Sequence, residues 1–165
     1  MRHVRFLALT GALLVLTECG QPEGPSASGH PFFTATLDGA TWVADFSDGF
    51  MLGSSTVISG RRYVSPQETE DIWIQIAGPP SVGKFALRGL FSPATGFFSK
   101  QTIGAPSLPL PYLSSDANPG VASVDGVNRS DSLIAGTFAF EAAQIPDTGA
   151  HHVLSGAFLV RYTAF

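Results

Sequence analysis

The sequence predicts an all-β domain, with an antiparallel β-sandwich as the expected architecture and a small antiparallel barrel as the alternative. Three observations support this prediction. Short runs of alternating apolar and polar residues recur along the chain, separated by turn-forming Gly, Pro, Asn and Asp. No stretch of helix length repeats apolar residues at the helical spacing. The length of 165 residues suits one domain, and a hydrophobic content of 44% is sufficient for a core.

Residues 1–18 are expected to be a signal peptide that lies outside this domain. Arg2 and Arg5 form a basic head, and the apolar run 6–16 follows them. This run is about half of the ~20 residues that a membrane-spanning helix needs. A short apolar run behind a basic head is typical of a secretory signal peptide.

The only cysteine of the chain follows this run. The segment Leu16-Thr17-Glu18-Cys19 resembles the lipobox of bacterial lipoproteins, in which the cysteine is acylated and becomes the new N-terminus. Leu16 and Thr17 match that pattern, whereas Glu18 stands where Gly, Ala or Ser is usual. The resemblance implies a lipid anchor on Cys19. The alternatives are cleavage by the general signal peptidase, or a free cysteine in an exported chain without a disulfide partner.

Residues 19–31 are predicted to be a flexible tether between this anchor and the domain, because they are rich in Gly, Pro and Ser. Gly20 follows the cysteine directly. An Asp at that position of a lipoprotein signals retention in the inner membrane, so we expect a periplasm-facing or surface-facing address at the outer membrane. Residues 32–165 then form a single β domain.

The first elements expected in the domain are two strands joined by a tight hairpin. Apolar and polar residues alternate through 33–38, and an Asp-Gly pair follows, a typical two-residue turn because Gly adopts positive φ without steric cost. The alternation resumes with Trp42, Ala44 and Phe46 on one face. We therefore expect Trp42 to lie in the core.

The middle of the chain offers three strands and a long loop. Residues 50–60 are expected to form one strand, and 83–90 begin another. Residues 102–120 contain four prolines and no alternation, which predicts a long loop or a sheet edge. The clearest alternation runs through 71–77, with three isoleucines on one face: Ile72, Ile74 and Ile76.

The last third of the chain contains a near-repeat. Residues 132–140 and 152–160 each place a Gly two residues before a Phe, on a face of otherwise apolar residues. Pairing of the two as a hairpin around residue 146 would bring these faces together. A Gly in mid-strand is destabilising unless an aromatic ring covers it or another backbone approaches closely. We therefore expect a packing role for Gly136 and Gly156.

Four pieces of the domain carry a resemblance to a known family: FTATLDGATWVA at 33–44, GKFAL at 83–87, IAGTFAFEA at 134–142 and LSGAFLV at 154–160. Through these pieces the chain resembles a domain-of-unknown-function family of small exported bacterial lipoproteins. The resemblance implies an exported β-sandwich-type domain. It implies no activity and no catalytic residues, because the family has none assigned.

Two groups of residues are candidates for chemistry. His151 and His152 are adjacent, and Asp147 could orient His151. Neighbouring residues on a strand point to opposite faces, so the two imidazoles are not expected to share one metal ion. The second group is an acidic set that could offer oxygen ligands to calcium or serve as the paired carboxylates of a glycosidase, although solvated loop charge is the preferred interpretation: Asp45, Asp48, Glu68, Glu70 and Asp71.

Aromatic residues are the candidates for binding. Exposed rings stack on sugars, and exposed apolar patches often mark interaction sites. We select Trp73, Phe97, Phe98 and Tyr112 as the candidate binding surface, because Trp73 lies opposite the isoleucine face and the other three lie in or near the long loop.

The function expected from the sequence is a non-catalytic binding or structural domain of the bacterial cell envelope. Its expected partners are the membrane, through lipidated Cys19, and a glycan or another envelope protein. No cofactor or metal is expected. Nucleic-acid binding is not expected either, because the net charge is −4 and no basic run is present. The alternative is an envelope hydrolase, directed at glycans or esters, that uses acidic residues with His151 or His152.

Overall fold

The computed structural model describes residues 28–105, 111–144 and 150–163. In these parts of the chain all regular structure is β, which confirms the predicted fold class. The strands are β1 Phe32–Leu37, β2 Ala40–Val43, β3 Phe46–Leu52, β4 Ser55–Ser65, β5 Glu68–Ala77, β6 Gly83–Leu87, β7 Ala94–Thr102, β8 Tyr112–Leu113, β9 Gly120–Asn128, β10 Leu133–Gln144 and β11 His151–Thr163.

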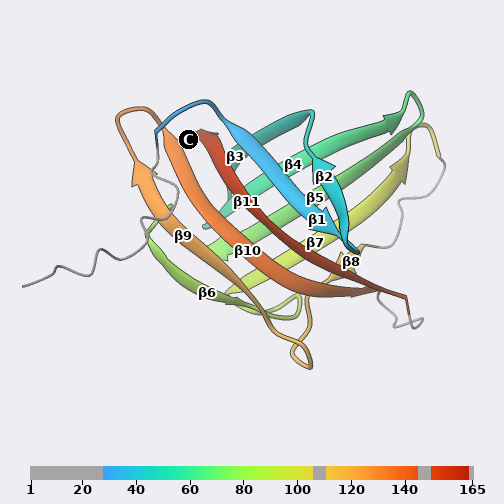
Figure 1. Ribbon diagram of the computed structural model, residues 1–165. Coiled ribbons are helices and arrows are strands. Elements are labelled where there is room, and N and C mark those ends of the chain that lie inside the picture. Colours follow the sequence, from blue (N-terminus) through green and yellow to red (C-terminus); the bar gives the residue numbers. More distant parts are fainter. Residues whose placement is uncertain (1–27, 106–110, 145–149, 164–165) are drawn as a thin grey trace, which may run out of the picture.

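The strands form one sheet that closes on itself. Their order is β2-β1-β11-β3-β4-β5-β7-β8-β10-β9-β6, and β10 also pairs with β11. This extra pairing closes β11, β3, β4, β5, β7, β8 and β10 into a ring, in which only the β11–β3 pairing is parallel. Figure 1 shows β1, β9, β10 and β11 as one layer crossing in front of β4, β5 and β7. The core lies between these two layers.

The expected tight hairpin joins β1 to β2. Asp38 and Gly39 both have positive φ, 50° and 83°, as a two-residue turn with the twist of the flanking strands requires. The predicted alternation fails after β2. The pairing of β2 with β1 ends at Ala44, whose amide donates to the Phe33 carbonyl, and the Asp45 amide already donates to the Arg61 carbonyl of β4 before β3 begins at Phe46. Phe46 is 58% exposed and does not share the face of Trp42, which is fully buried as predicted.

The segment 50–60 was expected to be one strand and is two. A turn containing Gly53, with φ of 60°, separates β3 from β4, which pair as an antiparallel hairpin. The long loop is close to the prediction, because β7 ends at Thr102 and β9 begins at Gly120. Among the described residues of that segment, 103–105 and 111–119, the short strand β8 is the one strand, and it links β7 to β10.

The near-repeat forms the predicted pair of strands. Gly136 on β10 lies opposite Phe158 on β11, and Phe138 lies opposite Gly156. A Cβ on Gly136 would lie 2.7 Å from the Phe158 ring and 2.0 Å from the Ser123 carbonyl oxygen. The packing role expected for these glycines is confirmed, since each is covered by the aromatic ring opposite it and approached by a neighbouring backbone.

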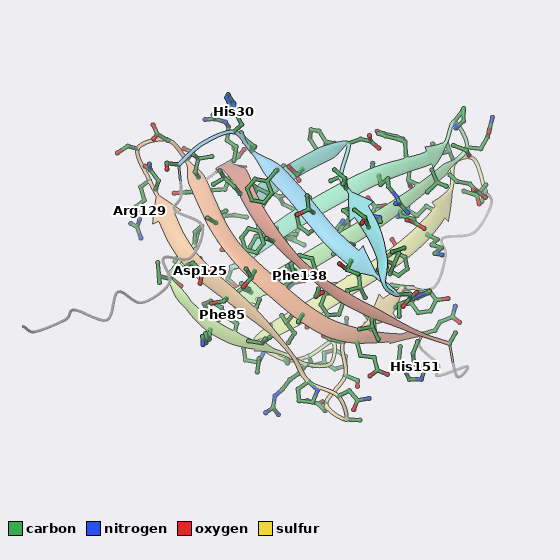
Figure 2. The ribbon with its side chains drawn as sticks, in the orientation of Figure 1. His30, Phe85, Asp125, Arg129, Phe138 and His151 are labelled. Atoms are coloured by element: carbon green, nitrogen blue, oxygen red, sulfur yellow. The ribbon has the colours of Figure 1, made fainter. Side chains whose placement is uncertain are left out.

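The core consists of the inward-facing side chains of both layers. The three isoleucines of β5 are buried as the alternation predicted, and Phe33 packs edge-on against Trp42 with 5.9 Å between ring centroids. Figure 2 shows Phe138 within the front layer. The largest fully buried side chains are Trp42, Phe33, Phe98, Phe158, Ile58, Ile72, Ile74, Leu87, Ile134, Leu154, Val57 and Val124.

Candidate functional site

The inward faces change from apolar to charged at one end of the molecule. On β5 the isoleucine face continues to Glu70, and on β7 the face of Phe98 continues to Lys100. On β4 the residue after Gly60 on the same face is Arg62. The strand registers place Arg62 opposite Glu70 and Glu70 opposite Lys100, so one carboxylate lies between two cations on adjacent strands. This end lies toward the right in Figure 1.

Glu70 is a buried carboxylate that three donors stabilise. The Trp42 indole Nε1 donates to Oε2 at 3.0 Å, and Arg62 Nη2 donates to the same oxygen at 2.5 Å. Lys100 Nζ lies 3.6 Å from Oε1. Burial of an unpaired carboxylate costs several kcal/mol, so these partners are what permits it here. The Arg62 guanidinium also lies 5.7 Å from the centroid of the Trp42 ring, in cation–π range.

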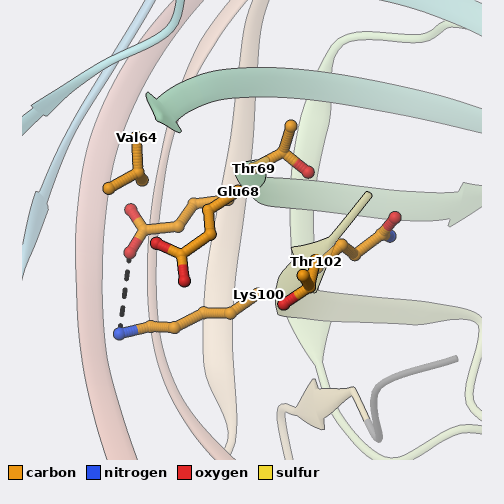
Figure 3. Close-up of a pocket in the computed structure, with 7 residues that line it drawn as sticks. Val64, Glu68, Thr69, Lys100 and Thr102 are labelled. Atoms are coloured by element: carbon orange, nitrogen blue, oxygen red, sulfur yellow. Dashed lines mark ion pairs between the residues drawn. The ribbon is translucent and has the colours of Figure 1, made fainter. Parts of the chain in front are cut away.

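A pocket of about 230 Å³ opens beside this row. Figure 3 shows the side chains of Glu68 and Lys100 extending from their strands in the same direction. The Glu68 carboxylate has no ion-pair partner in the described part of the chain, whereas Lys100 is paired with Glu70. The pocket therefore combines two carboxylates and one ammonium group. Its lining is Val64, Glu68, Thr69, Glu70, Lys100, Gln101 and Thr102.

A second ion pair lies at the same end, between the β1–β2 turn and β11. His152 Nδ1 donates to Asp38 Oδ2 at 2.6 Å, and the Val153 amide donates to Asp38 Oδ1 at 2.8 Å. Burial raises the pKa of Asp38, but the hydrogen bonds from His152 and Val153 and the charges of His152 and Lys100 outweigh burial and hold that pKa below its usual value. We call Asp38, Arg62, Glu70, Lys100 and His152 the end cluster.

The two adjacent histidines diverge. His152 points inward, where its ring centroid lies 4.9 Å from that of Phe98 and 4.6 Å from that of Tyr112. His151 forms an ion pair with Glu141 at 2.8 Å on the other face of the sheet, and Figure 2 shows it at the end of the β10–β11 hairpin. The expectation that a strand separates the two imidazoles is confirmed. Asp147 lies outside the described residues.

The acidic set does not converge. Asp45 accepts a hydrogen bond from the Tyr63 amide, Asp48 accepts one from the Ser59 hydroxyl, and Asp71 pairs with Arg61 at 2.6 Å. Glu68 and Glu70 line the pocket instead. Across the segments that the structure covers, no three His, Cys, Asp or Glu side chains lie close enough to hold a metal ion.

The four aromatic residues selected from the sequence do not share one surface. Trp73 on β5 lies opposite Phe97 on β7, and both face outward. Phe98 is fully buried, and Tyr112 packs against it with 5.8 Å between ring centroids. The division follows from the alternation of a strand, which sends neighbouring residues such as Phe97 and Phe98 to opposite faces.

Arg62, Lys100, Asp38 and Arg61 were missed by sequence reasoning. One pattern in the sequence could have identified three residues of the end cluster: Arg62, Glu70 and Lys100 each lie on an inward strand face, two residues beyond its last small or apolar residue. That these three residues are neighbours depends on which strands pair, and the pattern of a single strand does not contain that information.

Cys19 and the signal segment 1–18 lie outside the described residues, as does most of the predicted tether 19–31. His30, within the described end of that tether, is exposed. In the portion of the chain that the structure covers, no helix has the length and apolar character needed to cross a membrane.

The fold and this end cluster define an all-β domain with a polar pocket at one end. No protein-family model, curated protein or solved structure matches the chain. The family resemblance of residues 32–160 therefore stays a prediction.

Proposed function

We propose that this chain is an exported bacterial lipoprotein whose β domain serves the cell envelope as a non-catalytic binding or structural module. The observation that carries this proposal is Cys19 at the end of a short apolar run with a basic head, in a lipobox-like context. A Gly-, Pro- and Ser-rich segment then precedes β1, which begins at Phe32. This is the order of parts that a lipid-anchored envelope domain needs.

The ionic contacts of the domain support a non-catalytic role. A hydrolase of the serine or paired-carboxylate type needs a nucleophile or a second carboxylate directed at one reacting atom. The closest polar contacts of Asp48, Asp71 and Glu141 are instead with Ser59, Arg61 and His151. These contacts link neighbouring strands, so a structural role is sufficient to explain these acidic residues. Of the two pocket carboxylates, Glu70 is held by Trp42 and Arg62.

A hydrolase is the second candidate function, and the Asp38–His152 pair is the observation that favours it. A carboxylate on Nδ1 orients an imidazole and fixes its tautomer, as in general-base catalysis. The aromatic rings of Phe98 and Tyr112 contact His152, and a packed position in an aromatic cluster explains it equally well. A His152→Asn variant that loses a measurable glycosidase or esterase activity of the wild-type protein would establish the hydrolase.

Membrane partitioning of the wild-type protein and of Cys19→Ser in the native host tests the lipoprotein proposal. We expect the wild-type protein in the membrane fraction, extracted by detergent but not by high salt. The Cys19→Ser protein should move to the soluble fraction or remain unprocessed. Equal soluble distribution of both proteins would contradict the proposal and would indicate a secreted domain without an anchor.

A further inference from the structure

The outward face of β3, β4 and β5 and of β7 carries an ordered row of side chains. Trp73 lies at its centre, opposite Ser59 on one side and Phe97 on the other. Ser59 lies opposite Asp48 and donates a hydrogen bond to its carboxylate. The indole of Trp73 is 37% exposed, although the residues before and after it on β5 are fully buried isoleucines. A large ring is thus held at the surface by strands whose other face is core.

The adjacent row adds a charged pair to this face. The register places Arg61 opposite Asp71, and Asp71 is two residues from Trp73 on the same side of β5. Arg61 Nε donates to Asp71 Oδ1 at 2.6 Å. We call Asp48, Ser59, Arg61, Asp71, Trp73 and Phe97 the outer face.

One atom of the outer face lacks a partner. Asp71 is only 2% exposed, and its buried Oδ2 atom has no hydrogen-bond partner among the residues that the structure describes, while Oδ1 accepts a hydrogen bond from Arg61. A buried carboxylate oxygen without a donor costs free energy that a donor would recover. The Arg61 side chain, which is the ion-pair partner of this carboxylate, is 41% exposed. A ligand that displaces part of Arg61 and offers a hydroxyl group would supply the missing donor.

We infer that the outer face binds a polysaccharide of uncharged pyranose rings. Such a ring presents a C–H face, which packs on aromatic rings at a surface, here the exposed Trp73 and the half-buried Phe97. Its edge carries hydroxyl groups, which both donate and accept hydrogen bonds and so complement the Asp71 acceptor and the Arg61 donor. This inference rests on the proposed binding function and specifies its ligand.

The charges of the outer face argue against other ligand classes. Two carboxylates, Asp48 and Asp71, and one guanidinium, Arg61, give it no cationic excess, so a phosphate polymer would not be attracted. A lipid surface would have to cover an ion pair without supplying the donor that Asp71 lacks. An uncharged polyhydroxylated chain meets neither obstacle.

Binding of three uncharged probes to the full protein tests the inference: cellohexaose, chitohexaose and laminarihexaose. The protein is taken from whichever host fraction contains it, so the test does not depend on the state of Cys19. Tryptophan fluorescence reports directly on the site, since Trp73 and the buried Trp42 are the only two tryptophans. We expect at least one probe to bind and to protect Trp73 from acrylamide quenching.

Two variants distinguish binding at the outer face from nonspecific binding to the protein. Trp73→Ala should weaken binding at least roughly tenfold, because a central aromatic contact is lost. Phe91→Ala is the matched control, because Phe91 is 99% exposed and lies outside the outer face. Equal binding by wild type and Trp73→Ala, or no binding of any probe, would overturn the inference. Loss of membrane attachment with retained glycan binding would instead contradict the lipid anchor alone.

Discussion

Glu70 shows how a single residue depends on its neighbours. Its carboxylate is buried at the end of the isoleucine face of β5, and it is tolerated because Trp42, Arg62 and Lys100 surround it. The sequence pattern of β5 predicts that Glu70 shares the inward face. It does not predict the partners, because Arg62 and Lys100 lie eight residues before it and thirty residues after it and meet it only through strand register.

Removal of one partner should therefore cost more than a surface ion pair. Arg62→Ala leaves Glu70 with Trp42 and the more distant Lys100, and we expect a loss of about 2 kcal/mol in the free energy of unfolding, below the value for a fully buried pair because Arg62 is about one-third exposed. Urea unfolding of Arg62→Ala and of the exposed control Arg129→Ala measures this. A loss no greater than that of the control would show that the Arg62–Glu70 pair does not stabilise the fold.

Asp38 gives the domain a defined pH response. Its folded-state pKa lies below the unfolded value of about 4. Its ionised form therefore stabilises the fold fully above pH 4, and this stabilisation is lost as the pH falls through the folded-state pKa. The Asp38 side chain is 47% exposed, so the contribution should be below about 1 kcal/mol.

Asp38→Asn isolates that response, because Asn also tolerates the positive φ of the turn. We expect the stability difference between wild type and Asp38→Asn to be largest near neutral pH and to shrink below pH 4. Urea midpoints measured between about pH 2 and pH 7 provide the comparison. A difference that grows toward acid pH would contradict the assigned role of the Asp38 carboxylate.

At the scale of elements, the β10–β11 pair was the most predictable part of the fold. The near-repeat places Gly136 and Gly156 at equivalent points of two strands, and antiparallel pairing then brings each opposite a Phe. The same local reasoning failed at Phe46 and within 50–60. The change of direction there depends on the Asp45 amide, which donates to the Arg61 carbonyl of β4, and on the positive φ of Gly53. Local alternation alone does not distinguish a continuous strand from two strands joined by a turn.

The two mid-strand glycines should not accept even a methyl group. A Cβ at Gly136 would lie 2.0 Å from the Ser123 carbonyl oxygen, and one at Gly156 would lie 2.2 Å from that of Thr34. We expect Gly136→Ala and Gly156→Ala each to destabilise the domain by roughly 3 kcal/mol, since backbone must move. Thermal and urea unfolding measure the effect.

Gly89→Ala is the matched control for these two variants. A Cβ at Gly89 would meet only Asp116 Oδ2, at 3.4 Å, which is an ordinary contact. The change should stay within about 0.5 kcal/mol. Effects of Gly136→Ala and Gly156→Ala as small as that of this control would contradict the close approach of β10 to Ser123 and of β11 to Thr34.

At the scale of the whole molecule, composition and alternation predict the all-β class, and strand register determines where function can reside. The sequence pattern predicts one binding surface made of Trp73, Phe97, Phe98 and Tyr112. The sheet instead places the first two on its outer side and the last two on its inner side. The ring closed by β8 and by the β10–β11 pairing joins segments far apart in the chain. Such long-range pairings leave no local pattern that a single sequence displays.

The central claim about the whole protein is that Cys19 carries a lipid that holds this domain at the envelope. Intact-mass spectrometry of the protein purified from its native host tests it most directly. The account predicts a chain that begins at Cys19 and carries the added mass of a diacylglyceryl group, with or without a third acyl chain. A mature chain that begins elsewhere, or that begins at Cys19 without added mass, would contradict it.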